Sequence, residues 1–226
     1  MAWNIFVINL NDRVDRWQHS LTQLEKLGWN AHRVQAIESP ADSKFFTNPA
    51  VASCWLSHKK ALSEFLLTES THALILEDDF EVRVALNETD FQCLMKSDLD
   101  FIQIGFLYTT LLERIYIKFE NFYDLTVRTY GFFERILWNK GVSEKLLVRE
   151  RLSLPYDFVF ADIRPGAHCY FLNRKAAAYL ISVNDPIFLS TDDLYMSLGK
   201  MKYVRMARLR KSKVSQTNSQ SSINPR

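Results

Sequence analysis

The sequence predicts an α/β fold with a single, mostly parallel central sheet that is flanked by helices. Short apolar runs rich in β-branched residues alternate with segments in which apolar residues recur every three or four positions. The chain of 226 residues is long enough for one domain, and its 47% hydrophobic and 24% charged residues exclude general disorder. No internal repeat is visible, so a solenoid is excluded.

The first half of the chain contains four expected strands and two expected helices. Apolar residues at Trp17, Leu21, Leu24 and Leu27 form one face of a helix, and Gly28 is placed to end it. A second helix shows inward positions at Leu62, Phe65 and Leu66, and a polar segment with two prolines before it reads as a loop. The expected strands are Ile5–Leu10, Ala31–Ile37, Ala73–Leu76 and Phe101–Gly105, and the second helix is Ser53–Leu67.

The second half begins with an aromatic-rich segment at about residues 106–154. We interpret it either as an amphipathic insertion at an acceptor site or membrane surface, or as core aromatics on irregular structure, which we favour. After it, strands are expected at Phe158–Ile163 and Ala167–Leu172, a helix at Arg174–Ser182 and a final short helix after Asp192 and Asp193.

The charges are unevenly distributed along the chain. Residues 200–226 contain eight Lys or Arg and no acidic residue, which leaves twenty basic and twenty-six acidic residues in the remainder. We therefore expect a domain at residues 1–199 followed by a basic C-terminal tail at 200–226. Such a tail suits a polyanionic partner, such as anionic lipid, a phosphorylated substrate or nucleic acid, although a merely solvated tail has the same composition.

Two features of the sequence bear on the cellular compartment: the N-terminal apolar run and the spacing of the cysteines. The N-terminal apolar run lacks a preceding basic residue and predicts a strand in place of a signal peptide, and no apolar run reaches the roughly 18 residues that span a bilayer. Three widely spaced cysteines without a CxxC pair argue against a disulfide framework or a zinc site. These features predict a cytoplasmic protein.

The most informative motif is ALILEDDF, from Ala73 to Phe80. Four apolar residues predict a buried strand, and three carboxylates follow directly at its end. Three adjacent carboxylates repel one another unless a cation compensates, and their oxygen atoms favour Mg²⁺ or Mn²⁺. Because side chains alternate along an extended chain, Glu77 and Asp79 are expected to point the same way. The alternative is an ordinary charged exit from a strand.

Several familiar catalytic motifs are absent from the sequence. It contains no GxxxxGK[ST] loop, no GxGxxG after the first strand, no HExxH and no GxSxG. The remaining chemistry for a metal-bound diphosphate is departure of a nucleoside diphosphate, with the cation neutralising the developing charge.

Four stretches, in this order and spacing, resemble glycosyltransferase family 25, which contains lipooligosaccharide and collagen galactosyltransferases. They are VINLNDRVDR (Val7–Arg16), SCWLSHKKAL (Ser53–Leu62), ALILEDDF and GAHCYFLNRKAAAYLI (Gly166–Ile181), with weaker similarity at Asp192 and at Val214–Gln216. The resemblance covers nearly the whole chain outside the aromatic-rich segment. It implies a GT-A type nucleotide-diphospho-sugar transferase fold and an inverting transfer from a UDP-sugar.

The resemblance also implies roles for individual residues. Asp79 would bind the metal ion, Glu77 would face the metal or the sugar nucleotide, and Asp78 would support the loop. Asp192 is the first candidate for the catalytic base and Asp193 the second, although Asp at a helix start is also a common N-cap. The further candidates for contact with the donor are Asn9, Arg13, Arg16, Ser57, His58, His168 and Gln216. The two histidines can equally be structural residues.

The function expected from these residues is metal-dependent transfer of a hexose, galactose first, from a UDP-sugar to a lipooligosaccharide or lipopolysaccharide acceptor. The cofactor would be Mn²⁺ or Mg²⁺. The aromatic segment and basic tail would hold the enzyme against the cytoplasmic face of an anionic membrane. Two alternatives remain open at this point: a metal-dependent nucleotidyl- or phosphotransferase, and a non-catalytic protein that binds a nucleotide sugar or nucleic acid.

Overall fold

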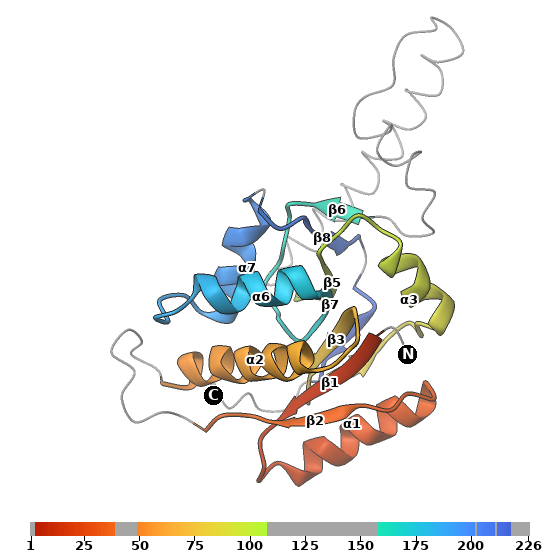
Figure 1. The fold of residues 1–226 in the computed structure, drawn as a ribbon. Helices are drawn as coiled ribbons and strands as arrows, with labels where there is room; N and C mark the ends of the chain where they lie inside the picture. The colour runs from red at the N-terminus through yellow and green to blue at the C-terminus, as the bar shows by residue number, and fades with distance from the viewer. Residues whose placement is uncertain (1–2, 39–48, 108–157, 202, 211, 218–226) are drawn as a thin grey trace, which may run out of the picture. The chain divides into compact units, whose positions relative to one another are not determined.

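The structure of the chain is a computed structural model (Figure 1). It describes residues 3–38, 49–107, 158–201, 203–210 and 212–217. These residues belong to one compact unit, which is formed by the chain on both sides of the aromatic-rich segment. Most of that segment, expected at about residues 106–154, lies outside the described residues, and so does most of the loop before Pro49.

The centre of the unit is one mixed sheet, whose main path runs in the order β2-β1-β3-β7-β5-β8-β6. Strands β1, β2, β3, β5 and β8 run in one direction, whereas β7 and β6 run antiparallel to their neighbours. Strand β4 pairs with β9, which also pairs with β5. The strands are β1 (Trp3–Asn9), β2 (His32–Gln35), β3 (His72–Glu77), β4 (Phe80–Val82), β5 (Phe101–Gly105), β6 (Phe158–Phe160), β7 (Cys169–Asn173), β8 (Met206–Leu209) and β9 (Val214–Gln216).

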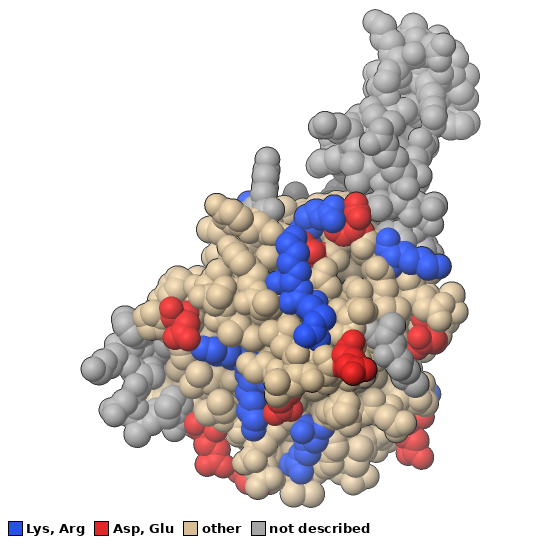
Figure 2. Space-filling model, in the orientation of Figure 1, with Lys and Arg blue, Asp and Glu red and all other residues tan. Residues whose placement is uncertain are grey.

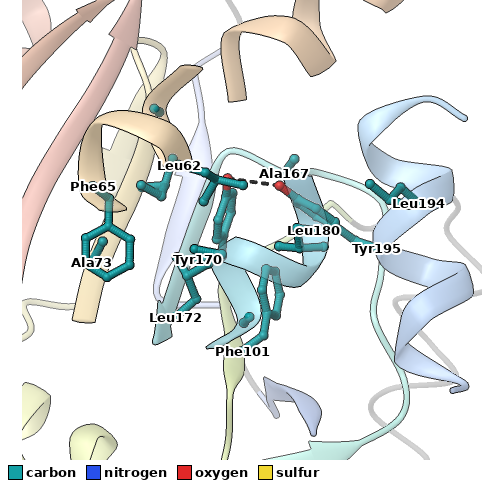
Figure 3. Packing of buried hydrophobic residues seen from close by; sticks show 14 of the residues in the cluster. Leu62, Phe65, Ala73, Phe101, Ala167, Tyr170, Leu172, Leu180, Leu194 and Tyr195 are labelled. Carbon is teal, nitrogen blue, oxygen red and sulfur yellow. Dashed lines mark hydrogen bonds between the residues drawn. The ribbon is translucent and has the colours of Figure 1, made fainter. Parts of the chain in front are cut away.

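Helices cover both faces of the sheet (Figure 1). On one face, α2, α6 and α7 pack over a core that contains Phe6, Tyr170 and Leu172 (Figure 3). On the other face, Trp3 of β1 stacks on Phe91 of α3, and α1 contacts β1 and β4. Alternation along each strand explains the two cores, because neighbouring residues point to opposite faces. The helices are α1 (Val14–Lys26), α2 (Pro49–Leu67), α3 (Glu88–Met95), α6 (Arg174–Val183) and α7 (Thr191–Gly199).

The expected α/β organisation is confirmed, and the elements lie close to the expected positions. Helix α1 is followed by Gly28, whose φ of 65° suits a residue without a side chain. The strand expected at Phe101–Gly105 has those same bounds. Asp192 and Asp193 occupy the first turn of α7, whereas Ser190 is its N-cap.

The expected boundary between a domain and a basic tail is wrong for the described part of residues 200–226. Strand β8 lies inside the sheet, between β5 and β6, and β9 pairs with β4 and β5. Arg208 is fully buried in β8, where its guanidinium donates to Asp162 (2.6 Å) and lies over the ring of Phe106. A charge in the middle of a strand is tolerated here because the partner compensates it.

The surface of the described unit carries both signs of charge. On the face drawn in Figure 2, Lys and Arg side chains form a broken line, with Asp and Glu side chains beside it. Arg205, from the expected tail, pairs with Asp98 (3.1 Å). Among the helices that the structure describes, none is both long and apolar enough to cross a membrane.

Candidate active site

The candidate site lies where three strand ends meet at one edge of the sheet. Strands β1 and β3 are parallel, with Ile8 opposite Glu77, so both end at this edge. Strand β7 is antiparallel to β3 and therefore starts there, with Cys169 opposite Leu76. The backbone N–H of Glu77 donates to the carbonyl of His168 (3.0 Å). This arrangement brings together residues that are far apart in the sequence, at the carboxyl ends of parallel strands where α/β proteins bind ligands.

The three carboxylates do not continue the strand as expected. Glu77 is the last residue of β3, and Asp78 and Asp79 form the turn into β4. The argument that Glu77 and Asp79 point the same way along an extended chain is therefore wrong, because residues in a turn do not alternate. The turn is fixed from outside by Thr217, whose N–H donates to the carbonyl of Asp79 (2.8 Å).

Asp78 is the structural member of this acidic turn. Its carboxylate accepts hydrogen bonds from Asn9 Nδ2 (2.6 Å) and Arg16 Nη1 (3.1 Å), and its carbonyl accepts from the Ser20 hydroxyl. Burial raises the pKa of Asp78, and the contacts with Asn9 and Arg16 oppose the rise. Asn9 and Arg16 thus hold the turn against the end of β1 and the start of α1.

Asp79 is the residue of the acidic turn whose carboxylate has an oxygen without a hydrogen-bond donor among the described residues. Its Oδ1 is buried and has no hydrogen-bond partner among the described residues, and its Oδ2 lies 3.9 Å from Arg16 Nη1. Burial, together with the charges of Glu77 and Asp78, raises the pKa of Asp79 to about 7. A divalent cation at this oxygen would stabilise the charged carboxylate, so the residues present fit the expected Mg²⁺ or Mn²⁺.

Glu77 has a protein donor on each carboxylate oxygen. His58 Nε2 donates to Oε1 (3.1 Å), and Gln216 Nε2 donates to Oε2 (3.2 Å). Burial favours a higher pKa for Glu77, but the hydrogen bond and charge of His58, with His168 and Gln216, lower it below the ordinary value. The expected residues Glu77, His58 and Gln216 are thus in direct contact, and Glu77 is held ionised.

His58 is in turn held by a pair of tyrosines that the sequence did not single out as site residues. The Tyr170 hydroxyl forms a hydrogen bond with His58 Nδ1 (2.9 Å) and accepts one from the Tyr195 hydroxyl (2.9 Å; Figure 3). Both tyrosines are buried. Burial favours a lower pKa for His58, but Tyr170, Cys54 and Glu77 outweigh it and raise that pKa well above the ordinary value.

His168 is enclosed between two glycines. A Cβ atom at Gly105 would lie 2.6 Å from its Nε2, and one at Gly166 would lie 2.9 Å from its Nδ1. The imidazole is fully buried; Nε2 hydrogen bonds with the carbonyl of Val214, and Nδ1 has no partner within the described ranges. Burial lowers the pKa of His168, which opposes its protonation. His168 therefore supports the site through its buried ring and through its carbonyl, which accepts from the N–H of Glu77.

The structure separates the two candidate bases, Asp192 and Asp193. Asp192 is half-buried, and backbone hydrogen bonds from Gly166 and Ala167 hold its carboxylate. Burial and the charge of Glu77 raise its pKa above the ordinary value. Asp193 is exposed and accepts a hydrogen bond from the helix-capping Ser190 (2.6 Å). Asp193 thus serves the start of α7.

Two expected donor-site residues lie outside this network. Arg13 pairs with Asp15 at the start of α1 (2.9 Å), and that contact lowers the pKa of Asp15 to about 2. The Ser57 hydroxyl donates to the carbonyl of Ser53 (2.7 Å) and accepts from the N–H of Ile37 (2.8 Å). Ser57 is buried, and its hydroxyl links α2 to the backbone just after β2. Its contacts in the structure are therefore with the backbone.

The fold has a counterpart among solved glycosyltransferase structures. The fold is similar to that of a glycosyltransferase involved in the glycosylation of the major capsid of PBCV-1, with a TM-score of 0.50 at 8% identity over 97% of this chain and 94% of that one. The chain is also similar to A197 from STIV (TM-score 0.46, 14% identity, 95% of this chain and 83% of that one). A third similar structure is S. aureus TarS with UDP-GlcNAc (TM-score 0.40, 11% identity, 99% of this chain and 60% of that one).

The sequence decides the family. The profile of Glycosyltransferase family 25 (LPS biosynthesis protein) matches residues 2–195, and the chain belongs to this family. The expected family and GT-A type fold are therefore confirmed. No curated protein matches the chain.

Proposed function

We propose that this glycosyltransferase moves a hexose, galactose first, from a UDP-sugar to a saccharide acceptor of lipooligosaccharide or lipopolysaccharide, with inversion at the anomeric carbon. Family membership supports glycosyl transfer over the nucleotidyl- or phosphotransferase alternative and over a nucleic-acid binding role. The observation that carries the donor part of the proposal is the buried, unpartnered Oδ1 of Asp79 at the edge of the sheet.

In this proposal, the donor diphosphate lies at the acidic turn. Asp79 would hold Mn²⁺ or Mg²⁺, and Glu77, at the end of β3, is the second acidic group of the site. The cation supplies charge neutralisation for the departing diphosphate. Arg16 lies between Asp78 and Asp79 and keeps the turn in place in the absence of a ligand. Glu77, fixed by His58 and Gln216, orients the donor, and the buried His168 supports the backbone at Glu77.

Asp192 is the proposed base. Its carboxylate takes the proton from the acceptor hydroxyl while that oxygen bonds to the anomeric carbon. The bond between the anomeric carbon and the diphosphate oxygen breaks, and UDP leaves with the electron pair. The raised pKa of Asp192 brings it closer to neutral pH, which improves a general base. The N–H groups of Gly166 and Ala167 fix its orientation.

The acceptor side of the proposal includes peripheral contact with the cytoplasmic face of an anionic membrane. The positive charge that residues 200–226 offer to a membrane is smaller than the sequence suggests, because Arg208 is buried against Asp162. The basic residues on the surface in Figure 2 would supply the attraction. Binding to anionic vesicles that weakens with salt, and is absent with neutral vesicles, is the result expected from this part of the proposal.

The decisive test combines calorimetry with product analysis. UDP should bind the wild-type protein with Mn²⁺ and much more weakly without it, and Asp79→Asn should remove the dependence on Mn²⁺. Asp98→Asn, at an exposed acid beside β5, is the matched control and should bind as the wild type does. Incubation with UDP-sugars and saccharide acceptors should release UDP. Release of pyrophosphate or phosphate would indicate a nucleotidyl- or phosphotransferase. Absence of both UDP affinity and turnover would refute the proposal.

A further inference from the structure

A second group of metal-ligating side chains lies beside the acidic turn. Cys54 and His58 are four residues apart on α2 and therefore on one face of the helix. Glu77 approaches them from the end of β3. One ligand atom from each of the three residues lies within 4.8 Å of the other two. Within the described ranges, this is the one group of three or more His, Cys, Asp or Glu with that geometry.

The donor atoms of this group differ from those of the acidic turn. A thiolate sulfur, an imidazole nitrogen and a carboxylate oxygen together suit Zn²⁺ or Co²⁺, whereas Mg²⁺ and Mn²⁺ prefer oxygen alone. Ligand atoms on a tetrahedral zinc ion lie about 3.3–3.6 Å apart, given bond lengths of about 2.0–2.3 Å. His58 Nε2 and Glu77 Oε1 are already 3.1 Å apart. A small movement of Cys54 completes three corners of the tetrahedron.

The surroundings fix the ligands in the orientation that a metal ion requires. His58 Nδ1 is held by Tyr170, which leaves Nε2 directed at Glu77. Metal-bound histidines commonly use the second nitrogen in this way, and the contact sets the ring orientation. The Cys54 sulfur lies 3.4 Å from the Thr191 hydroxyl, which can donate to a thiolate. Glu77 is 25% exposed, so the group is reached from solvent at this ligand.

We propose that Cys54, His58 and Glu77 form a binding site for Zn²⁺ or a similar borderline-soft cation, separate from the hard-cation site at Asp79. The spacing of the cysteines gave no sign of it, because the third ligand comes from another element. An ion bound there occupies Glu77. If the proposed function is right, Zn²⁺ therefore lowers donor affinity and inhibits transfer; the binding site itself does not rest on that function.

The test uses Co²⁺ as a spectroscopic probe of the full-length protein. Sulfur ligation gives a thiolate-to-cobalt charge-transfer band, which no oxygen-only site produces. We expect one equivalent of Co²⁺ to give this band in the wild type, Zn²⁺ to displace it, and Cys54→Ser to lack it. Cys93→Ser is the matched control, because Cys93 is a half-buried cysteine on α3 outside the group, and it should retain the band. Glu77→Gln should weaken Zn²⁺ binding at least tenfold.

Two further measurements test Cys54 as a ligand and separate this site from the one at Asp79. Zn²⁺ should protect Cys54 of the wild-type protein from alkylation, as read by peptide mass spectrometry, which needs no variant to fold. Asp79→Asn should keep the cobalt band while losing Mn²⁺-dependent UDP affinity, so the two metal proposals fail separately. A wild-type protein without the band, a band that survives Cys54→Ser, or alkylation of Cys54 unchanged by Zn²⁺ would overturn the assignment.

Discussion

His58 Nε2 lies 3.1 Å from Oε1 of Glu77, and the imidazole is only 1% exposed while the carboxylate reaches the surface of the site. The contact joins the middle of α2 to the end of β3. It lowers the pKa of Glu77, and with Tyr170 and Cys54, the larger causes, it raises that of His58 against the opposing effect of burial. The pair therefore sets both the charge and the orientation of Glu77, whose charge in turn raises the pKa of Asp192 together with burial.

The first prediction concerns this pair. His58→Phe keeps an aromatic ring but leaves Oε1 of Glu77 without its donor. Losing a hydrogen bond to a charged group costs about 1–3 kcal/mol, so the KM for the UDP-sugar should rise roughly tenfold. His58→Gln should recover part of the loss. Tyr195→Phe, which changes only the far end of the hydrogen-bonded chain, is the control and should stay near the wild type. An unchanged KM in His58→Phe would contradict the assigned role.

The second prediction distinguishes the two aspartates of α7. Asp192→Asn should reduce kcat by about 10²–10⁴ without weakening UDP binding, because only proton removal is lost. Asp193→Asn should leave kcat unchanged and cost about 1 kcal/mol of stability at the helix start. Since the pKa of Asp192 is raised above 3.8, the acidic limb of the wild-type kcat/KM profile should lie above that value. Steady-state kinetics across pH, with calorimetry of UDP, checks all three; an active Asp192→Asn would move the base elsewhere.

The third prediction concerns the glycine at the end of β5. Gly105→Ala places a Cβ 2.6 Å from His168 Nε2 and 2.9 Å from the Cβ of Cys169, so neighbouring atoms must shift. We expect a loss of about 1–3 kcal/mol in the free energy of unfolding, measured in urea. Adding His168→Ala removes one of the two close contacts. The double variant should therefore lose less stability than the sum of the single variants, and strict additivity would refute the close packing.

The fourth prediction is the dependence of stability on acid. Asp100 is buried and accepts hydrogen bonds from Asn173 Nδ2, Lys175 Nζ and the N–H of Arg205, all at 2.9 Å. Burial favours a higher pKa, but these contacts outweigh it and lower the pKa of Asp100 below 3.8. A lowered pKa in the folded state means that the stabilisation is present above the unfolded pKa and is lost as the pH falls through the folded value.

The wild type should therefore lose its advantage over Asp100→Asn as the pH falls below about 4, the unfolded pKa of aspartate, and through the lowered folded pKa. Near pH 7 the variant should be less stable by about 1–3 kcal/mol, because the charged contacts are lost. Urea unfolding of both proteins at several pH values measures the difference. A difference that does not shrink on acidification would show that ionised Asp100 does not stabilise the fold.

The sequence carried enough local information to predict the first part of the sheet. Strands β1, β3 and β5 are short apolar runs, and their burial needs no distant partner to be recognised. The position of the acidic turn at the carboxyl end of β3 followed from the same pattern. Strand β8 was missed because Arg208 reads as part of a basic tail. Only the tertiary structure provides Asp162 and the Phe106 ring that make its burial possible.

The site contacts that the sequence did not predict also depend on tertiary structure. His58 and Tyr170 are 112 positions apart, so no local periodicity reveals that the hydroxyl holds the imidazole. The antiparallel direction of β7, which brings His168 to the edge, is likewise set by the topology of the sheet. The position of Ser57 within a motif suggested a ligand contact, whereas its hydroxyl fastens two backbone segments.

The position of β8 between β5 and β6 has a consequence for biosynthesis. Residues 158–160 leave the ribosome before residues 206–209, yet in the described sheet β6 pairs only with β8. This part of the sheet thus stays incomplete until residues 206–209 have left the ribosome, and β5 lacks its β8 partner until then.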